Sequence, residues 1–307
     1  MITSIFNKSK SINFIIVFLV TILAFLTARI GTVNYPMTPA YIFKQLAIFS
    51  ICVLTIVVFN FIITKNNLSK KNNYEVLLFS LFLLTLVETT LSTDILLSNF
   101  FVLLGLRRIV SLKSQQNVKN KLFDAALWIT VASLFYFWAI LFLIVIVLSL
   151  ILYTDNNLRH WLIPFFGIAT VVVIAVCTSI IMYNDYFTIF KGTAVLSYDF
   201  STYNSTRYLV AITTLLSFGI WSSIFYLQEI KKKKKAFRAS FKIVLFAAAI
   251  AFIIILIVPV KKGSEFLFLF APLAIIITNY IEIIPDKWFK EAFLWALVII
   301  PFVLLSL

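Results

Sequence analysis

Two acidic residues, Glu88 and Asp94, stand between two apolar stretches and could act on a phosphate-containing substrate. A carboxylate can serve as a general base, while cations hold phosphate oxygens. The cations could come from four residues near other polar loops: Arg29, Arg207, Lys261 and Lys262. These side chains predict a site for a lipid-linked phosphate. The alternative is that all six are ordinary charges at the water boundary, where a charge costs little.

Other kinds of catalytic or metal site find little support in the sequence. His160 is the single histidine, which excludes a four-histidine iron site and most histidine acid–base schemes. Cys52 and Cys177 lie in apolar blocks, where disulfide or metal roles are not expected. No glycine-rich phosphate loop, CxxC or HExxH motif occurs. We therefore expect no metal and no cofactor.

The elements that must position these residues are membrane helices. Hydrophobic residues make up 62% of the chain and charged residues 12%, against about 25% charged in soluble domains. The apolar blocks are long enough to span a bilayer, and short polar loops separate them. The sequence predicts an all-α, polytopic transmembrane bundle, a single domain over residues 1–307. The blocks are 12–28, 45–64, 74–88, 94–106, 125–153, 160–182, 208–228, 241–260, 266–282 and 291–307.

The net charge of +14 could indicate nucleic acid, but in a membrane protein it indicates topology. Cytoplasmic loops collect Lys and Arg. The strongest marker is the run from Lys231 to Lys235, with Lys232, Lys233 and Lys234 between them. We expect this run on the cytoplasmic side and no nucleic-acid partner.

The uncharged stretch 125–153 decides the orientation of everything after it. As one helix it would be about 45 Å long, beyond a hydrocarbon core of about 30 Å. A hairpin turning near Leu134 to Trp138 places most of the 26 basic residues on one side, so the positive-inside rule favours it. Its arms would be about 20 Å long and reach half depth. One long tilted helix is the alternative. The hairpin gives about eleven helices, a cytoplasmic N-terminus and an external C-terminus.

Arg107 and Arg108 close the fourth block on the same predicted inner side as Lys231 to Lys235. Basic residues at the cytoplasmic end of a membrane helix contact anionic lipid head groups. The sequence therefore predicts a cytoplasmic lipid-facing surface formed by both groups. Simple topogenic charge is the alternative. The expected partners are membrane lipids and other membrane proteins of the cell envelope.

The stretch LSNFFVLLGLRRIVSLKSQQNVKNKLFDAALWITVASLFYFWAILFLIVIV, which begins at Leu97, resembles an uncharacterised bacterial family of multi-pass membrane proteins. Some members of that domain-of-unknown-function family carry the automatic label beta-carotene monooxygenase, an iron chemistry that one histidine cannot support. The helix arrangement also resembles GT-C glycosyltransferases, which use polyprenyl-phosphate sugars. That resemblance implies an acid in the first outer loop, yet residues 29–44 hold none. Either Glu88 or Asp94 replaces it, or catalysis is lost.

Three functions follow for an inner-membrane protein of the bacterial envelope. The first is a non-catalytic GT-C-like subunit or scaffold that binds partner proteins or polyprenyl or anionic lipid. The second is a polyprenyl-phosphate-dependent glycosyltransferase acting at the outer leaflet. The third is a transporter or flippase, which needs buried charges near the middle of the membrane. The sequence places almost none there, so this function ranks last.

Overall fold

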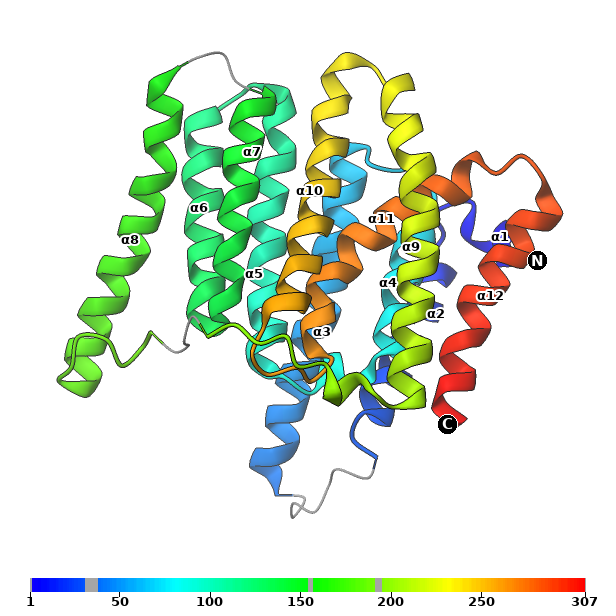
Figure 1. The fold of residues 1–307 in the computed structure, drawn as a ribbon, viewed down its shortest axis with the longest axis horizontal. Helices are drawn as coiled ribbons and strands as arrows, with labels where there is room; N and C mark the ends of the chain where they lie inside the picture. The colour runs from blue at the N-terminus through cyan, green and yellow to red at the C-terminus, as the bar shows by residue number, and fades with distance from the viewer. Residues whose placement is uncertain (1, 31–37, 154–156, 191–194, 307) are drawn as a thin grey trace. The chain divides into compact units, whose positions relative to one another are not determined.

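The computed structural model describes residues 2–30, 38–153, 157–190 and 195–306. This part of the chain forms twelve α-helices and five short 3₁₀ helices, without strands (Figure 1). The helices are α1 (Ile2–Phe6), α2 (Ser11–Thr27), α3 (Pro39–Asn66), α4 (Tyr74–Thr85), α5 (Thr93–Val110), α6 (Val118–Phe135), α7 (Leu143–Tyr153), α8 (Leu158–Tyr183), α9 (Thr206–Lys232), α10 (Lys235–Ile257), α11 (Leu267–Ile283) and α12 (Lys287–Ser306). The 3₁₀ helices are η1 (Val87–Thr90), η2 (Ser111–Ser114), η3 (Phe137–Phe142), η4 (Ser201–Tyr203) and η5 (Ser264–Phe266).

Helices α2 to α12 correspond one to one with the helices that hydropathy predicts, and α1 is an addition. Helix α3 begins before its apolar block because Thr38 caps it, accepting a hydrogen bond from the backbone N of Tyr41 at 3.3 Å, and Pro39 occupies the first turn. The predicted outer loop 29–44 is therefore shorter than expected. Residues 31–37 of that loop and residues 191–194, between α8 and α9, lie outside the described residues.

Seven helices in the described ranges are long and apolar enough to cross a membrane, as expected of a membrane-embedded protein. They are Pro39–Asn66, Thr93–Ser114, Leu158–Tyr183, Thr206–Lys232, Lys235–Ile257, Ser264–Ile283 and Lys287–Ser306. Shorter apolar helices are Ser11–Thr27, Tyr74–Thr85 and Phe137–Tyr153. The inner membrane and the cytoplasmic N-terminus stay predictions.

The stretch 125–153 is a hairpin, so the alternative of one long helix is wrong. Helix α6 ends where Tyr136 takes an extended conformation, and η3 and α7 return along α6. The amide of Gln115, just before α6, donates to the carbonyl of Tyr153 at 3.2 Å, which closes the hairpin. The first arm is longer than predicted: its 18 residues make about 27 Å. Its polar first turns extend it, and Asp124 there pairs with Arg108 at 2.8 Å.

The chain forms two compact units. Unit 1 comprises Met1–Leu96, Asp199–Lys232 and Val260–Leu307, and unit 2 comprises Leu97–Tyr198 and Lys233–Pro259. In unit 1, α4 is buried along its whole length, and α2, α3, α11 and α12 contact it. A helix that is apolar all round belongs in the middle of a bundle. The other central helix, α11, also packs on α9.

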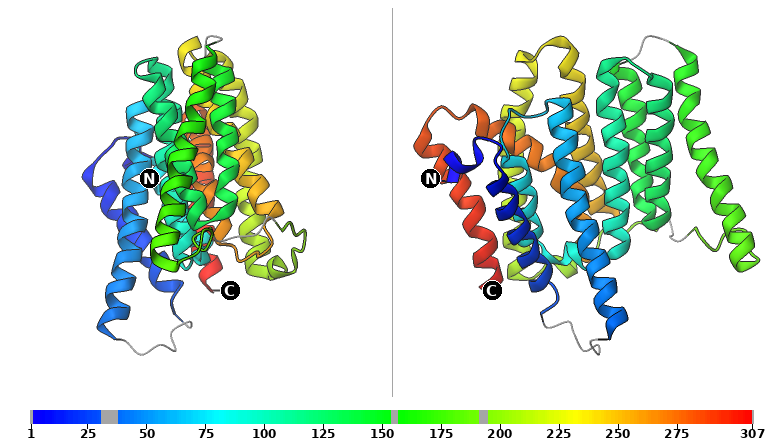
Figure 2. Two further views of the ribbon diagram at one scale, coloured as in Figure 1. Left: turned by 90° about the vertical axis from the view of Figure 1, so that its left-hand side faces the viewer. Right: turned by 180° about the vertical axis from the view of Figure 1, so that it is seen from behind.

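Unit 2 holds the hairpin together with α8 and α10. Helix α10 contacts η3 and α7, and α8 runs along α6 (Figure 2). The α6–α8 approach is close because Gly167 has no side chain. A Cβ atom there would lie 2.7 Å from the carbonyl oxygen of Phe123 and 2.9 Å from the Cβ atom of Ala126. Small residues allow such close contact between helices in membranes.

We expect Gly167→Ala to weaken the packing of α8 on α6, because the new methyl group clashes with backbone atoms of α6 that cannot change rotamer. Overpacking of this kind costs about 1–3 kcal/mol of unfolding free energy. Gly219→Ala is the matched control: its Cβ atom would approach the flexible Leu273 side chain, at 2.8 Å. Hydrogen exchange of α8 in detergent micelles measures the effect. Equal protection of α8 in both variants would contradict this packing account.

Candidate functional site

Most of the residues predicted to handle phosphate, but not Asp94, lie at one end of unit 1. Helix η1, which carries Glu88, contacts the end of α2 and also η5. Arg29 follows α2, and Arg207 lies in the first turn of α9. We call Arg29, Glu88, Thr90, Arg207, Lys261 and Glu265 the η1 cluster. The cluster therefore draws on segments that lie far apart in the sequence.

Arg29 links three elements through its guanidinium group. Its Nε donates to Oε1 of Gln45 on α3 at 2.6 Å. Its Nη1 and Nη2 donate to the hydroxyl and the carbonyl oxygen of Thr90 in η1, at 3.2 and 3.0 Å. The group also lies 3.4 Å from the ring centre of Phe25 on α2. Burial lowers the pKa of Arg29 from its ordinary value. The planar fork of arginine suits this many fixed contacts better than an ammonium group would.

The two candidate bases have different surroundings. Oε1 of Glu88 forms an ion pair with Nη1 of Arg207 at 3.6 Å. Asp94 is exposed in the first turn of α5, where the helix dipole favours an acid. Among the described residues, no hydrogen bond or ion pair joins Asp94 to the η1 cluster. The structure thus brings Glu88, and not Asp94, to the predicted cations.

Glu265 organises the loop that carries Lys261 and Lys262. Its carboxylate is fully buried and accepts hydrogen bonds from the hydroxyl of Tyr203 and from the backbone N of Lys262 and Gly263, the latter two at 3.3 and 3.1 Å. Gly263 has φ of +82°, which favours glycine. This carboxylate is therefore engaged in shaping the loop.

The two lysines of this loop differ in exposure. Lys261 is 4% exposed, and its ammonium lies 4.6 Å from the ring centre of Phe200. Burial lowers the pKa of Lys261, and the nearby Glu265 and Asp199 oppose that shift. Lys262 is exposed, and its backbone carbonyl accepts from the hydroxyl of Tyr208 at 3.1 Å. Only Lys262 of the two presents its side chain to the surroundings.

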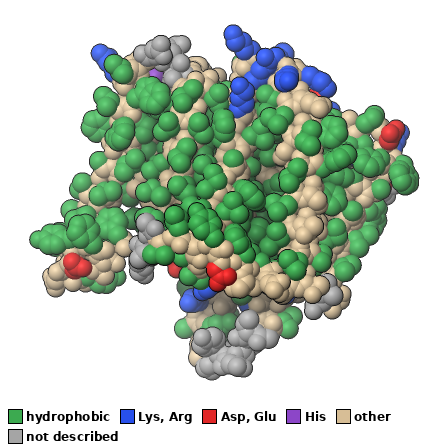
Figure 3. All heavy atoms as spheres, in the orientation of Figure 1, with side chains coloured by type: hydrophobic (Ala, Val, Ile, Leu, Met, Phe, Trp, Pro, Cys, Tyr) green, Lys and Arg blue, Asp and Glu red, His purple; other side chains and the backbone are tan. Residues whose placement is uncertain are grey.

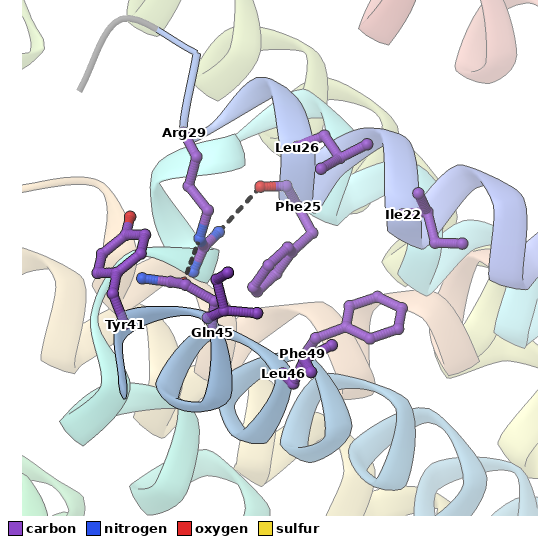
Figure 4. A pocket seen from close by; sticks show the side chains of 9 residues that line it. Ile22, Phe25, Leu26, Arg29, Tyr41, Gln45, Leu46 and Phe49 are labelled. Carbon is purple, nitrogen blue, oxygen red and sulfur yellow. Dashed lines mark hydrogen bonds between the residues drawn. The ribbon is translucent and has the colours of Figure 1, made fainter. Parts of the chain in front are cut away.

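A cavity of about 390 Å³ lies between α2 and α3, with Arg29 at one end (Figure 4). Arg29, Tyr41 and Gln45 form its polar end, and the rest of its wall is apolar. The apolar wall comprises Ile22, Phe25, Leu26, Ile42, Leu46 and Phe49. Sequence reasoning singled out Arg29 but missed the cavity, because hydropathy does not show how two helices diverge.

Five residues of the predicted cytoplasmic surface, Arg107, Arg108 and Lys233 to Lys235, belong to unit 2. The hydroxyl of Ser240 on α10 donates to the carbonyl of Val110 at 3.4 Å, so the end of α5 meets the start of α10. Arg107 and Arg108 thereby lie at the same end as Lys233, Lys234 and Lys235. Figure 3 shows Lys and Arg side chains over the turn between α9 and α10.

Aromatic rings and acids hold several of these cations in place. The ammonium groups of Lys113 and Lys233 lie 4.4 and 5.0 Å from the ring centres of Phe237 and Phe241. At the end of α9, in unit 1, Lys232 pairs with Glu229 at 2.6 Å. Contact with anionic lipid stays a prediction for this surface.

The chain matches DUF6427, a family of unknown function, over residues 1–306. No curated protein and no solved structure matches it. The predicted resemblance to an uncharacterised family is confirmed at that level. The GT-C-like arrangement stays a prediction. The description of the matched family does not mention a monooxygenase.

We expect Arg29→Lys to destabilise unit 1, because an ammonium cannot reproduce the contacts with Gln45 and Thr90 together. Hydrogen bonds to charged groups contribute about 1.5–3 kcal/mol each, so a loss of about 2 kcal/mol of unfolding free energy is expected. Unfolding in mixed micelles measures it. Arg159→Lys, at an exposed position, is the matched control. An equal change in both variants would show that Arg29 does not hold these elements together.

Proposed function

The chain belongs to the DUF6427 family, and we propose that it is a non-catalytic membrane protein of the bacterial envelope that binds an anionic lipid. The hydrocarbon chain of the lipid lies in the cavity between α2 and α3, and its phosphate meets Arg29. Polyprenyl phosphates and anionic phospholipids share this chemistry. The single observation that carries the proposal is an apolar cavity that ends in a guanidinium group.

The dimensions and lining of the cavity support a lipid chain. Ligand pockets typically enclose about 300–1,000 Å³, and the 390 Å³ of this cavity falls within that range. Six of its lining residues are aliphatic or phenylalanine, and the polar ones share one end. An amphiphile with one polar end has the same arrangement.

Selectivity for the lipid comes from its head group. A chain that leaves the bilayer for an apolar cavity exchanges one hydrocarbon environment for another, so it gains little from the hydrophobic effect. A charge-assisted hydrogen bond between a guanidinium and a phosphate contributes about 1.5–3 kcal/mol. The phosphate replaces the neutral Gln45 side chain at Nε of Arg29, and the Gln45 amide turns to donate to it.

The state of the acids favours binding over catalysis. Glu88 is paired with Arg207, Asp94 is exposed, and Glu265 is used by its own loop. A glycosyltransferase needs a carboxylate that faces its substrate. The glycosyltransferase and the transporter or flippase remain the second and third proposals.

A scaffold also needs surfaces for partner proteins of the envelope. Helix α8 buries little of its surface: Phe165 and Phe166 are 68% and 66% exposed. Lipid tails or a neighbouring membrane protein can cover such a face. Purification in mild detergent, followed by identification of the proteins and lipids that remain bound, supports the scaffold role if the same partner is recovered repeatedly.

We expect Arg29→Gln to weaken binding of anionic lipid about 10-fold to 100-fold, the equivalent of about 1.5–3 kcal/mol. Native mass spectrometry with added polyprenyl phosphate or phosphatidylglycerol measures the bound fraction. Leu46→Trp, which fills the cavity, should reduce binding while the phosphate contact remains.

Two further variants separate binding from catalysis. Lys262→Gln removes an exposed charge from the same end of unit 1 and should leave binding unchanged. Glu88→Gln should also leave lipid binding unchanged. Neither the wild type nor Glu88→Gln should release sugar from a polyprenyl-phosphate sugar. Binding that is insensitive to both Arg29 and Leu46 would refute the lipid site. Sugar release that disappears with Glu88→Gln would establish the glycosyltransferase instead.

A further inference from the structure

A carboxyl group lies fully buried at the opposite end of α4 from the η1 cluster. Glu75 is the second residue of α4 and its exposure is 0%. Among the described residues neither of its oxygens has a partner in hydrogen-bond geometry, although the Ser69 hydroxyl lies near the carboxyl group. Helices α2, α3, α11 and α12 surround α4. Glu75 is not recognisable from the sequence, because one acid near the edge of an apolar block resembles a boundary charge.

Buried neutral polar residues occur on two helices that pack against α4. Asn13 on α2 and Asn66 on α3 are both buried. The side-chain oxygen of Asn13 has no hydrogen-bond partner among the described residues. Ser69 in the loop before α4 is within reach of the Glu75 carboxyl group, and Glu282 on α11 acts on it electrostatically. No basic side chain pairs with Glu75 in the described part of the chain.

The charged and titratable groups at this end of unit 1 are engaged with one another. Oε1 of Glu282 accepts from the backbone N of Lys70 and the amide of Asn72, at 2.7 and 2.5 Å. On α12, Lys290 lies 5.1 Å from the ring centre of Tyr74, and Glu291 accepts from Thr3. An ionised Glu75 would carry the same sign of charge as Glu282 on α11, and like charges repel.

The free energy of burial decides whether Glu75 is ionised or protonated at this site. Burial of an ionised carboxylate without a partner carries a large free-energy cost. The dipole at the start of α4 favours the ionised form, but its contribution is much smaller. The cost of burial therefore exceeds the gain from the dipole, and the carboxyl group must be neutralised.

We propose that Glu75 is a proton-binding site, a carboxylic acid at neutral pH that exchanges its proton with water at this end of unit 1. A proton needs one oxygen, whereas Na⁺, Mg²⁺ or Ca²⁺ needs several oxygen ligands around it. The described residues contain no group of three or more His, Cys, Asp or Glu that could hold a metal ion. The site therefore fits a proton better than a metal cation.

Residues 67–73, the loop between α3 and α4, separate Glu75 from water. The amide of Asn279 on α11 donates to the carbonyl of Leu68 at 2.8 Å, and Glu282 holds Lys70 and Asn72. Ser69 within this loop is within reach of the Glu75 carboxyl group. In this proposal the proton exchanges between the Glu75 carboxyl oxygen and water at this loop, where Ser69 is partly exposed. Proton release places a charge against the start of α4 and so weakens its packing.

Infrared spectroscopy of the protein in lipid nanodiscs tests the proposal. At pH 7, where an exposed glutamate is ionised, the wild type should show the carbonyl band of a protonated carboxyl group, which shifts in D₂O. Glu75→Gln should remove the band, and Glu75→Asp should move it. Asp94→Asn, at an exposed carboxylate, is the control and should leave it unchanged. Circular dichroism confirms that each variant is folded.

Thermal unfolding adds a second measurement. A proton held by the folded state and lost on unfolding stabilises the protein less as the pH rises. The wild type should therefore lose stability from pH 5 to pH 9 more steeply than Glu75→Gln. A wild type without the band, or a band that persists in Glu75→Gln, would overturn the proposal. A band that disappears when NaCl replaces choline chloride at constant pH would also overturn it, in favour of a sodium site.

Discussion

The fold depends on one constraint: in an apolar bundle a charged or polar group is tolerated only where another polar group, a proton or water meets it. Unit 1 meets this constraint differently at its two ends. At one end the guanidinium of Arg29 satisfies the carbonyl groups of Phe25 and Thr90 and the amide of Gln45. At the other end Asn279 and Glu282 hold the α3–α4 loop, while among the described residues neither oxygen of Glu75 has a partner in hydrogen-bond geometry.

This contrast explains why the two ends lead to different proposals. In the η1 cluster Glu88 is paired with Arg207 and Glu265 is hydrogen-bonded within its own loop, while the adjoining cavity is apolar except at its Arg29 end. In the proposed function, a lipid phosphate exchanges the neutral contact between Arg29 and Gln45 for a charged one. The buried carboxyl group of Glu75 has no counter-charge in the described residues, so the smallest cation, a proton, is the simplest way to satisfy it.

Hydropathy and charge predicted the helices well. The hairpin at Tyr136 followed from the basic residues, because a single crossing would have separated Arg107 and Arg108 from Lys233 to Lys235. The start of α3 at Pro39 was missed because a polar cap and a proline, not hydrophobicity, define it. The cavity and the state of Glu75 were missed because both depend on how helices pack in three dimensions. The pairing of Glu88 with Arg207, far apart in the sequence, was not predictable for the same reason.

The central claim, that the cavity between α2 and α3 holds an anionic lipid, is tested most directly by photo-crosslinking in the native membrane. A photoreactive amino acid at position 46 faces the cavity, and mass spectrometry identifies what it captures. The account predicts adducts enriched in lipids with a phosphate head group and no positive charge, and loss of that enrichment when Arg29 is replaced by Gln. Adducts that only mirror the lipid composition of the surrounding membrane would contradict it.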